Sequence, residues 1–549
     1  MANFSSEVVN TDLLCVGGGI AGLMAAIRAS ELGASVIVAD KANTVHSGSG
    51  GMGNDHFQCY IPEIHGSDIK PIIEGFRHSP MSGWWRDQSF INAQIERSLE
   101  MVNLWDSWGI PMKHNGQYEF AGHGTPGKPL LALKYSGKNQ KSILTEQAVK
   151  RGVRIMNRMM IFELLRDDYM IGAIGIDART ERIVQFRAKS IFLGTGQCVR
   201  LYPGSTPGWM FNVANSPSTT GDGRAMAYRV GAELVILELP LTWAGPKYFN
   251  RCGKGTWIGM FKDQHGKSLS PFLTRPERKY GDSTADQYPE IFEEYDKAGN
   301  GPIYMDCSGI SDDDYNYMMW GLSNEGNLAL LNHMQEENID VRRNPVEFTT
   351  YGKDPRGGVF YNEKGETSVK GLYAAGDEIG VGISNAAIFG WIAGENAASY
   401  VKQVESPDTD RCKSQIEAGI KQVTAIRNRE EGISWQEANL ALQQIMQDYA
   451  GSIRSASLLE AGLTHLRRVK KKAHALLTAK NQHELMHCIE VLNMIDVGEL
   501  IFIAAMERKE TRGTHIRSDF PFANPLMDKL LFIKRMNGQP VMEWREIES

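Results

Sequence analysis

The feature that most constrains this chain is a glycine-rich turn close to its N-terminus. Residues 11–16 (TDLLCV) form an apolar run of strand length, and residues 23–32 carry apolar side chains at helical spacing. Between them, residues 17–22 read GGGIAG and have the spacing G-x-G-x-x-G. A second apolar run, residues 34–39, follows and ends at Asp40. The segment predicts a β-α-β unit with parallel strands and a right-handed crossover.

The glycines of this turn have different structural roles. Gly17 permits a tight turn, Gly19 lets the backbone approach a pyrophosphate, and Gly22 lets the helix pack closely against the strand. The helix N-terminus then offers unpaired N–H groups and a partial positive charge to phosphates. Asp40, at the end of the second strand, can accept hydrogen bonds from ribose hydroxyls. A glycine turn without a ligand is the alternative, and this context disfavours it.

Length and charge exclude several classes of protein. The chain has 549 residues, and domains typically hold roughly 100–200, so two to four domains are expected. The net charge of -6 argues against a general nucleic-acid binder and fits a membrane-surface protein poorly. Residues 1–10 are polar, and no stretch approaches the roughly 20 apolar residues of a membrane helix. We therefore expect a cytoplasmic protein that does not insert directly into a membrane.

Cysteine usage constrains the redox chemistry of the chain itself. There are seven cysteines, and none forms a C-x-x-C pair. Their odd number and wide spacing argue against a disulfide framework, a structural zinc site and a cysteine-ligated iron–sulfur cluster. We expect no metal site in this chain, so any cluster in the chemistry would be carried by another polypeptide.

Four segments carry a family resemblance that spans nearly the whole chain. They are VGGGIAGLMAA at the first turn, TTGDGRAMAYRVGAEL (residues 219–234), GLYAAGD (residues 371–377) and ERKETRGTHIRSDFP (residues 507–521). Together they resemble the flavoprotein subunits of the fumarate reductase/succinate dehydrogenase superfamily, which includes aspartate oxidase. Within it, the chain looks most similar to the adenylylsulfate reductase α subunit, through DKANTVHSGSGGMGNDHFQCYI (residues 40–61) and the residue 245–262 segment.

The resemblance implies a cofactor, a partner and a fold. It implies FAD, held noncovalently, because His46 stands where that branch has an Arg and not where succinate dehydrogenases have their attachment His. It also implies a separate ferredoxin-like iron–sulfur subunit. The expected fold class is α/β, a Rossmann-type FAD-binding domain with an inserted α+β capping domain and a C-terminal helical domain. We place the domains at 1–245 with 346–405 (FAD-binding, discontinuous), 246–345 (capping, substrate), 406–518 (helical) and 519–549 (C-terminal extension).

The candidate FAD-binding residues come from the motifs and from the ends of the predicted strands. Two distant strands, in residues 188–196 and 371–377, end in small-residue turns that can meet the flavin's ribityl-phosphate arm; ordinary strand ends are the alternative. A helix beginning at Asn385 could stabilise negative charge on the reduced flavin, a role compatible with plain capping. The full set is Gly17, Gly19, Ile20, Ala21, Gly22, Asp40, Lys41, Ser47, Gly48, Gly51, Thr195, Gly196, Thr220, Asp222, Gly376, Asp377, Ser384, Asn385 and Ile388.

Five residues are the candidate catalytic residues, expected close to the flavin and a small-molecule substrate: Trp209, Tyr351, Lys247, Arg251 and Gln58. Trp209 falls where the adenylylsulfate reductase branch has a Trp near the substrate, and stacking and core packing both remain open for it. Lys247 and Arg251 could clamp an anion, although a solvated loop is the stronger interpretation. Tyr351 could carry a proton or be structural.

Other side chains have equally open roles. Trp243 and Trp257 could stack on a planar substrate or pack in a core, and His265 could carry a proton or lie on the surface. The basic run at residues 467–472 (RRVKKK) is expected to be a solvated or subunit-docking face.

Departures from the family patterns bear on the substrate. The dicarboxylate enzymes use an HPT-type segment, a His before a GG turn and an Arg near the last helix. Here the equivalents are Leu241-Thr242-Trp243, Tyr351 near Arg356-Gly357-Gly358, and Ile383-Ser384-Asn385. Two carboxylates in a low-dielectric pocket would be poorly compensated without those cations, so fumarate reduction is disfavoured. The segment at residues 243–255 also lacks a secure match to the substrate Arg of adenylylsulfate reductase.

Three functions therefore remain as hypotheses. The first is an adenylylsulfate-reductase-like FAD subunit that exchanges electrons between a substrate at flavin N5 and an iron–sulfur subunit. The second is a fumarate-reductase-like flavin reductase or dehydrogenase of a different substrate, such as an unsaturated acid. The third is a non-catalytic FAD electron-transfer module, which would need neither the capping nor the helical domain.

Overall fold

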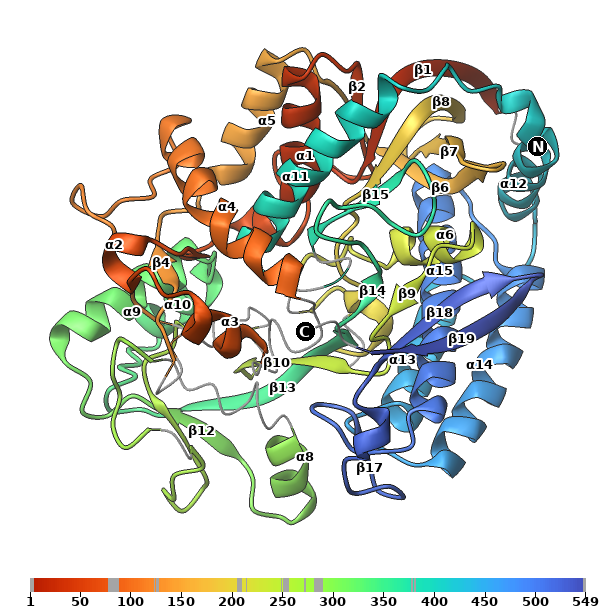
Figure 1. The fold of residues 1–549 in the computed structure, drawn as a ribbon. Coiled ribbons are helices and arrows are strands. Elements are labelled where there is room, and N and C mark those ends of the chain that lie inside the picture. The colour runs from red at the N-terminus through yellow and green to blue at the C-terminus, as the bar shows by residue number, and fades with distance from the viewer. Residues whose placement is uncertain are drawn as a thin grey trace.

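The computed structural model describes residues 4–77, 88–122, 124, 128–204, 210–213, 215–247, 249, 256–270, 273–280, 290–376, 379 and 382–546. Its central sheet has seven strands, in the order β5-β2-β1-β8-β7-β6, with β15 also pairing with β8 (Figure 1). Strands β5, β2, β1, β8 and β15 run parallel, while β7 and β6 are antiparallel additions. The strands are β1 (Ser5–Val16), β2 (Val36–Asp40), β5 (Arg154–Asn157), β6 (Met159–Arg166), β7 (Met170–Asp177), β8 (Arg182–Leu193) and β15 (Leu372–Ala374).

The predicted β-α-β unit is β1, α1 (Ile20–Glu31) and β2. Helix α1 packs against α11 (Ile383–Val401) so closely that glycine is needed at the contact. A Cβ added at Gly390 would lie 2.5 Å from the Ala21 carbonyl oxygen, and one at Gly394 equally close to that of Ala25. Helices α4 (Gln88–Ser107) and α5 (Gln140–Lys150) lie alongside this pair (Figure 1).

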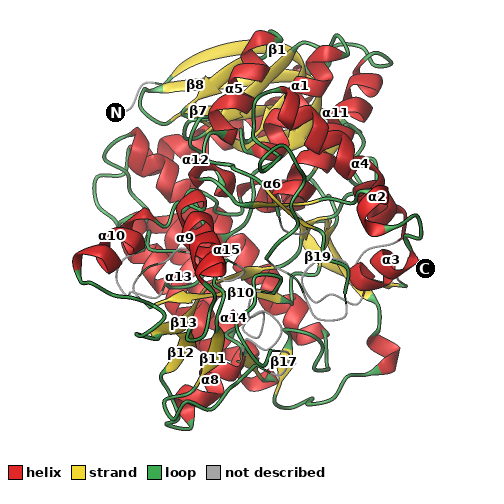
Figure 2. Ribbon diagram, turned by 90° about the vertical axis from the view of Figure 1, so that its left-hand side faces the viewer, coloured by secondary structure: helices red, strands yellow, loops and turns green. Residues whose placement is uncertain are grey.

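A second, four-stranded antiparallel sheet has the order β10-β13-β12-β11. The inserted segment contributes β11 (Met260–Lys262) and β12 (Ile303–Asp306), and flanking strands β10 (Pro240–Pro246) and β13 (Val346–Pro355) complete the sheet. This sheet and its helices have an apolar core of their own, which includes Trp257, Phe261 and Met318. The helices are α8 (Glu290–Lys297), α9 (Asp312–Asn324) and α10 (Leu328–Glu336). We call this unit the cap; Figure 2 shows its strands below the central sheet.

The C-terminal third is mainly helical, as the expected fold class implies. Its helices are α12 (Lys413–Arg427), α13 (Trp435–Tyr449), α14 (Ala456–Leu476) and α15 (Gln482–Glu507). Helix α13 begins with a capping box between Ser434 and Glu437. Helix α15 is almost entirely buried, since α12, α13 and α14 surround it. Among the described residues, no helix combines the length and apolar character needed to cross a bilayer.

The last residues, where the sequence shows little pattern, form a β-hairpin. Strands β18 (Leu530–Met536) and β19 (Gln539–Arg545) pair with each other, and β18 pairs with β9 (Leu234–Val235), which also contacts β14 (Gly358–Val359). The remaining short elements are α2 (Pro62–His65), α3 (Lys70–Arg77), α6 (Asp222–Arg229), and the strand pairs β3 (His56–Gln58) with β4 (Ala132–Lys134) and β16 (Ile453–Arg454) with β17 (Ile516–Arg517).

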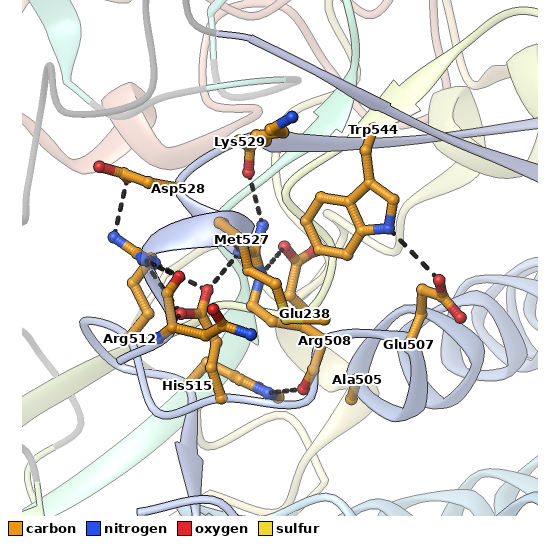
Figure 3. A network of polar contacts seen from close by, with 12 residues as sticks. Glu238, Ala505, Glu507, Arg508, Arg512, His515, Met527, Asp528, Lys529 and Trp544 are labelled. Atoms are coloured by element: carbon orange, nitrogen blue, oxygen red, sulfur yellow. Dashed lines mark hydrogen bonds and ion pairs between the residues drawn. The ribbon is translucent and has the colours of Figure 1, made fainter. Parts of the chain in front are cut away.

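A buried network of charged groups holds this end of the chain in place (Figure 3). Arg508 donates to Glu238 at 2.8 Å and to Glu510 at 2.7 Å, and Glu510 also accepts from Arg512 at 2.7 Å. His515 contacts the Arg508 carbonyl at 3.0 Å. Because Glu238 lies just before β10, the network links the helical region to the chain that enters the cap.

Candidate functional site

A long cavity opens at the carboxyl ends of the parallel strands, where α/β sheets usually bind ligands. It encloses about 1810 Å³, including its open mouth. Its walls come from the glycine turn, the loop after β2, the ends of β8 and β15, the start of α11, and the cap. The candidate residues on its lining are Gly17, Gly19, Ile20, Ala21, Asp40, Lys41, Ser47, Gly48, Gln58, Thr195, Gly196, Asp222, Gly376 and Ser384.

The glycine turn forms the tight wall that a dinucleotide needs. Gly17 has φ +95°, and a Cβ there would lie 2.4 Å from the Gly194 carbonyl oxygen. Gly22 is not on the lining; a Cβ there would lie 1.9 Å from the Gly17 carbonyl oxygen, so its role is helix–strand packing. Helix α1 starts directly after Gly19, which places its unpaired N–H groups at the cavity.

Asp40 lies on the lining, but its carboxylate also organises the turn. It accepts hydrogen bonds from the Gly18 N–H at 2.8 Å, the Ser47 hydroxyl at 2.8 Å and the Ala42 N–H at 2.7 Å. A carboxylate offers about four lone-pair sites, so one acceptor position remains for a ribose hydroxyl. The sequence suggested the ribose contact but gave no signal for the three protein donors.

Lys41 belongs to a charged network that reaches into the helical region. Its Nζ donates to Thr220 at 2.7 Å, to Asp222 at 2.6 Å and to Glu490 of α15 at 2.6 Å. Burial alone would lower the pKa of Lys41, but the two carboxylates raise it above its usual value. The ammonium group is therefore already neutralised by protein acids, and Thr220 lies off the cavity lining as a member of this network.

Three further candidates lie beside the lining and support it. A Cβ at Gly51 would lie 2.0 Å from the His46 carbonyl oxygen, so this glycine allows the loop to fold on itself. Asn385 accepts from the Tyr361 hydroxyl at 3.3 Å, and Ile388 is fully buried in the core. The side chain of His46 is exposed and off the lining. Asp377, Trp209 and Arg251 lie outside the described residues.

The cap candidates whose side chains the structure describes do not lie on the cavity lining. Lys247 pairs with Glu347 at 2.6 Å, and neither residue lines the cavity. Tyr351 pairs with Trp243 in the backbone register of β13 and β10, and the structure does not describe either side chain. Trp257 is fully buried in the cap core, which excludes its stacking on a substrate in the cavity, and His265 is exposed.

The part of the cavity that meets the cap contains the predicted candidate Gln58 and two residues, His56 and Glu325, that the sequence did not indicate. His56 and Gln58 line it from the same face of β3, because side chains alternate along a strand, and Phe57 points into the core. Glu325, at the end of α9, lines it from the cap. We call the region of His56, Gln58 and Glu325 the cap end of the cavity.

His56 is oriented by a buried acid. Its Nδ1 lies 2.8 Å from Oδ1 of Asp55, whose Oδ2 accepts from Thr256 of the cap at 3.1 Å. Asp55, His56 and Glu325 offer ligand atoms that all lie within 4.8 Å of one another, a spacing that suits a divalent cation or a shared proton. The cap is seated tightly here, since a Cβ at Gly53 would lie 2.1 Å from the Asn324 carbonyl oxygen.

The basic run of α14 has an ordinary surface role. Arg467 and Lys470 both pair with Glu499 of α15 at 2.8 Å, so part of the run is neutralised by a neighbouring helix. The six cysteines in the described part of the chain are buried and free.

Comparison with known proteins agrees with this geometry. A family model described as the FAD binding domain matches residues 12–388, and one described as the fumarate reductase flavoprotein C-term matches residues 439–548. A fumarate reductase (CoM/CoB) subunit from Methanothermobacter marburgensis is 24% identical, over 96% of this chain and 98% of that protein. L-aspartate oxidase of Vibrio cholerae is 22% identical over 93% of this chain and 96% of its own.

Solved structures show the same fold. Adenylylsulfate reductase of Archaeoglobus fulgidus superimposes with a TM-score of 0.87 at 21% identity, covering 100% of this chain and 97% of that one. Quinol fumarate reductase of E. coli gives 0.85 at 18% identity, covering 99% and 97%. The expected fold class and FAD are confirmed, and the glycine cradle fits the cofactor. The chain belongs to the FAD-dependent oxidoreductases of the fumarate reductase/succinate dehydrogenase flavoprotein superfamily.

Proposed function

We propose that this chain is the catalytic flavoprotein subunit of an adenylylsulfate-reductase-like enzyme. It would exchange electrons between a small-molecule substrate bound at the cap end of the cavity and a separate ferredoxin-like iron–sulfur subunit. The observation that carries the proposal is one continuous cavity, which runs from the dinucleotide turn to the cap and ends among His56, Gln58 and Glu325. An electron-transfer module without a substrate would not need polar side chains from two structural units at this place.

The residues of this chain have separable tasks in such an enzyme. When bound, FAD supplies hydride or adduct chemistry at N5. The glycine turn and the start of α1 would hold the diphosphate, and the start of α11, at Gly382 to Ser384, would stabilise negative charge on the flavin. The cap would exclude water and fix the substrate against Gln58 and His56. Iron–sulfur clusters on a separate polypeptide would explain why this sequence has no cysteine cluster motif.

The substrate can be tested with sulfite and AMP. Under anaerobic conditions, the FAD-loaded protein is mixed with sulfite, with AMP, or with both, and the flavin absorbance is followed. Bleaching that requires both compounds supports adenylylsulfate chemistry. Sulfite alone is the control, because it can add to flavins without a specific site. Because the sulfite adduct bleaches the flavin by itself, adenylylsulfate formed in the mixture is measured as well. No adenylylsulfate from sulfite and AMP together would reject the adenylylsulfate assignment.

One observation favours the second hypothesis, a reductase of an unsaturated compound. Reduction of a C=C bond needs a proton donor as well as a hydride, and a histidine oriented by a buried carboxylate is suited to that task. His56 and Asp55 form such a pair at the cap end. Lys41 is the one Lys or Arg among the described lining residues, and Asp222 and Glu490 neutralise it. The described lining thus has no cation to spare for a dicarboxylate, which among unsaturated acids favours one with a single carboxylate.

Reoxidation of the reduced flavin separates these alternatives. The FAD-loaded protein is reduced by dithionite, freed of excess reductant, and offered fumarate, crotonate or cinnamate. Faster reoxidation by a monocarboxylate than by fumarate supports the second hypothesis, and preference for fumarate contradicts the argument from the lining. If no substrate exchanges electrons with the flavin but an iron–sulfur protein does, the module hypothesis is the correct one.

A further inference from the structure

A buried lysine lies directly behind the glycine turn. Lys141, in the first turn of α5, is 2% exposed, whereas lysines are almost never buried without a partner. Its Nζ donates a hydrogen bond to the carbonyl oxygen of Gly18. Across the described residues, no carboxylate lies within ion-pairing distance of it, and Asp40 is the charged group that acts on it from a neighbouring element. Lys141 itself is not on the cavity lining.

The position of this hydrogen bond matters because of peptide geometry. The Gly18 carbonyl and the Gly19 N–H belong to the same peptide group, and in a trans peptide they point in opposite directions. Lys141 holds the carbonyl on the side away from the cavity, and Gly19 lines the cavity. The Gly19 N–H is therefore aimed into the space where an anion binds.

Both sides of Gly18 are fixed in this way. Asp40 accepts from its N–H at 2.8 Å, and Lys141 donates to its carbonyl. Glycine peptides rotate easily, so a turn with glycine at three consecutive positions needs such restraints. The neighbouring residue of α5 acts on the opposite loop, since Gln140 donates to the Gly50 carbonyl at 2.8 Å.

We propose that Lys141 is a positioning residue for FAD, which presets the diphosphate-binding peptide and places a positive charge behind it. The inference rests on FAD binding by this family and is independent of the substrate. Burial lowers the pKa of Lys141 to about 8, partly offset by Asp40, so the empty site holds this charge only weakly. A bound diphosphate would favour the charged lysine, and the charged lysine would favour the diphosphate.

Substitution of Lys141 tests this directly. K141M removes the donor and the charge while keeping much of the volume, and K150M is the matched control, because Lys150 is exposed on the same helix and pairs with Glu146 at 2.6 Å. The full-length apoprotein is titrated with FAD, ADP and adenosine, and its melting temperature is measured without ligand. We expect K141M to bind FAD and ADP at least tenfold more weakly and adenosine normally.

The apoprotein measurement distinguishes positioning from a merely structural role. Removing a buried, unpaired charge should leave the melting temperature of K141M apoprotein unchanged or higher. K150M should change neither property. If K141M does not fold, K141Q replaces it, since Gln keeps a donor without the charge, and the same preferential loss of FAD and ADP is expected. FAD affinity within twofold of wild type, or an equal loss for adenosine, would overturn the proposal.

Discussion

Replacing Glu490 by Gln tests whether the charged network beneath the cavity stabilises the fold. Glu490 lies within α15, and its side chain is 1% exposed. One carboxylate oxygen accepts from Lys41 at 2.6 Å, and the other accepts from Arg200 at 2.8 Å and lies 2.7 Å from His487 Nδ1. The Gln side chain has nearly the same shape but carries no charge, and it presents an NH₂ group to one of these donors.

The expected cost follows from what is left unpaired. Arg200 is as buried as Glu490 and would lose its carboxylate, and removing one partner of a buried pair costs about 3–5 kcal/mol. Lys41 keeps Asp222, so we expect a loss of about 3 kcal/mol in the free energy of unfolding. Glu499→Gln is the control on the same helix. Glu499 pairs with Arg467 and Lys470 nearer the surface, where such pairs contribute about 0–1 kcal/mol.

Urea unfolding of the FAD-loaded proteins, followed by circular dichroism and flavin fluorescence, measures both variants. Burial would raise the pKa of Glu490, but Lys41 and Arg200 hold it well below its usual value of 4.5. Its contribution is therefore complete above about pH 4.5 and is lost as the pH falls through the lower, folded-state pKa. The difference between wild type and E490Q should shrink in acid. Equal stability of E490Q and E499Q at pH 7 would refute the reasoning.

Three further predictions concern the C-terminal network, the cap end and the pH dependence of the apoprotein. Glu510→Gln should lower the melting temperature by several degrees, because fully buried Glu510 pairs with Arg508 and Arg512. It should change FAD affinity little, since Glu510 lies off the cavity lining; thermal unfolding and FAD titration measure the two effects. His56→Gln should slow flavin reoxidation by an unsaturated acid about 100-fold, which is the scale of general acid catalysis. FAD affinity and the rate of reoxidation by a one-electron acceptor should not change. Stopped-flow absorbance measures these rates, and a chelator added to the assay shows whether a metal contributes. Finally, the pKa of Lys141 in the folded protein is about 8, below its ordinary value of 10.5. Between pH 8 and pH 10.5 the unfolded chain therefore holds a proton that the folded chain has lost, so the stability of the wild-type apoprotein relative to K141M should rise with pH and level off above pH 10.5. Urea unfolding at several pH values measures this.

Short-range sequence patterns predict the part of the fold that begins the FAD-binding sheet. The glycine turn, two apolar runs and a terminal acid predict β1, α1 and β2, because each of these signals acts within a few residues. At the cap end the sequence predicts Gln58 but not the approach of His56 to Glu325. These two residues lie far apart in the sequence and meet only because α9 packs on the loop after β2. The alternating burial of β3 was missed because the segment from 43 to 58 is dominated by loop-forming residues.

The partners of buried charged residues cannot be predicted from the local sequence. Lys41 follows Asp40 directly and was assigned to the cofactor, yet the carboxylates that hold it come from α6 and from α15. Nothing in the sequence around Lys141 shows that this lysine is buried, because its polar neighbours are typical of an exposed helix start. The sequence does not predict the hairpin of β18 and β19, because the strand β9 with which β18 pairs has only two residues and leaves no recognisable pattern.

The two lysines together explain how the site can bind a dianionic diphosphate. The charge of Lys41 is already neutralised by Asp222 and Glu490, so this residue joins the FAD-binding sheet to the helical region and adds little net attraction for phosphate. Attraction must then come from the N–H groups at the start of α1 and from a positive charge not already paired. Lys141 is the buried lysine that meets this requirement in the described structure, and it acts through the Gly18 peptide without entering the cavity. A loss of FAD affinity in E490Q as large as that in K141M would contradict this division of roles.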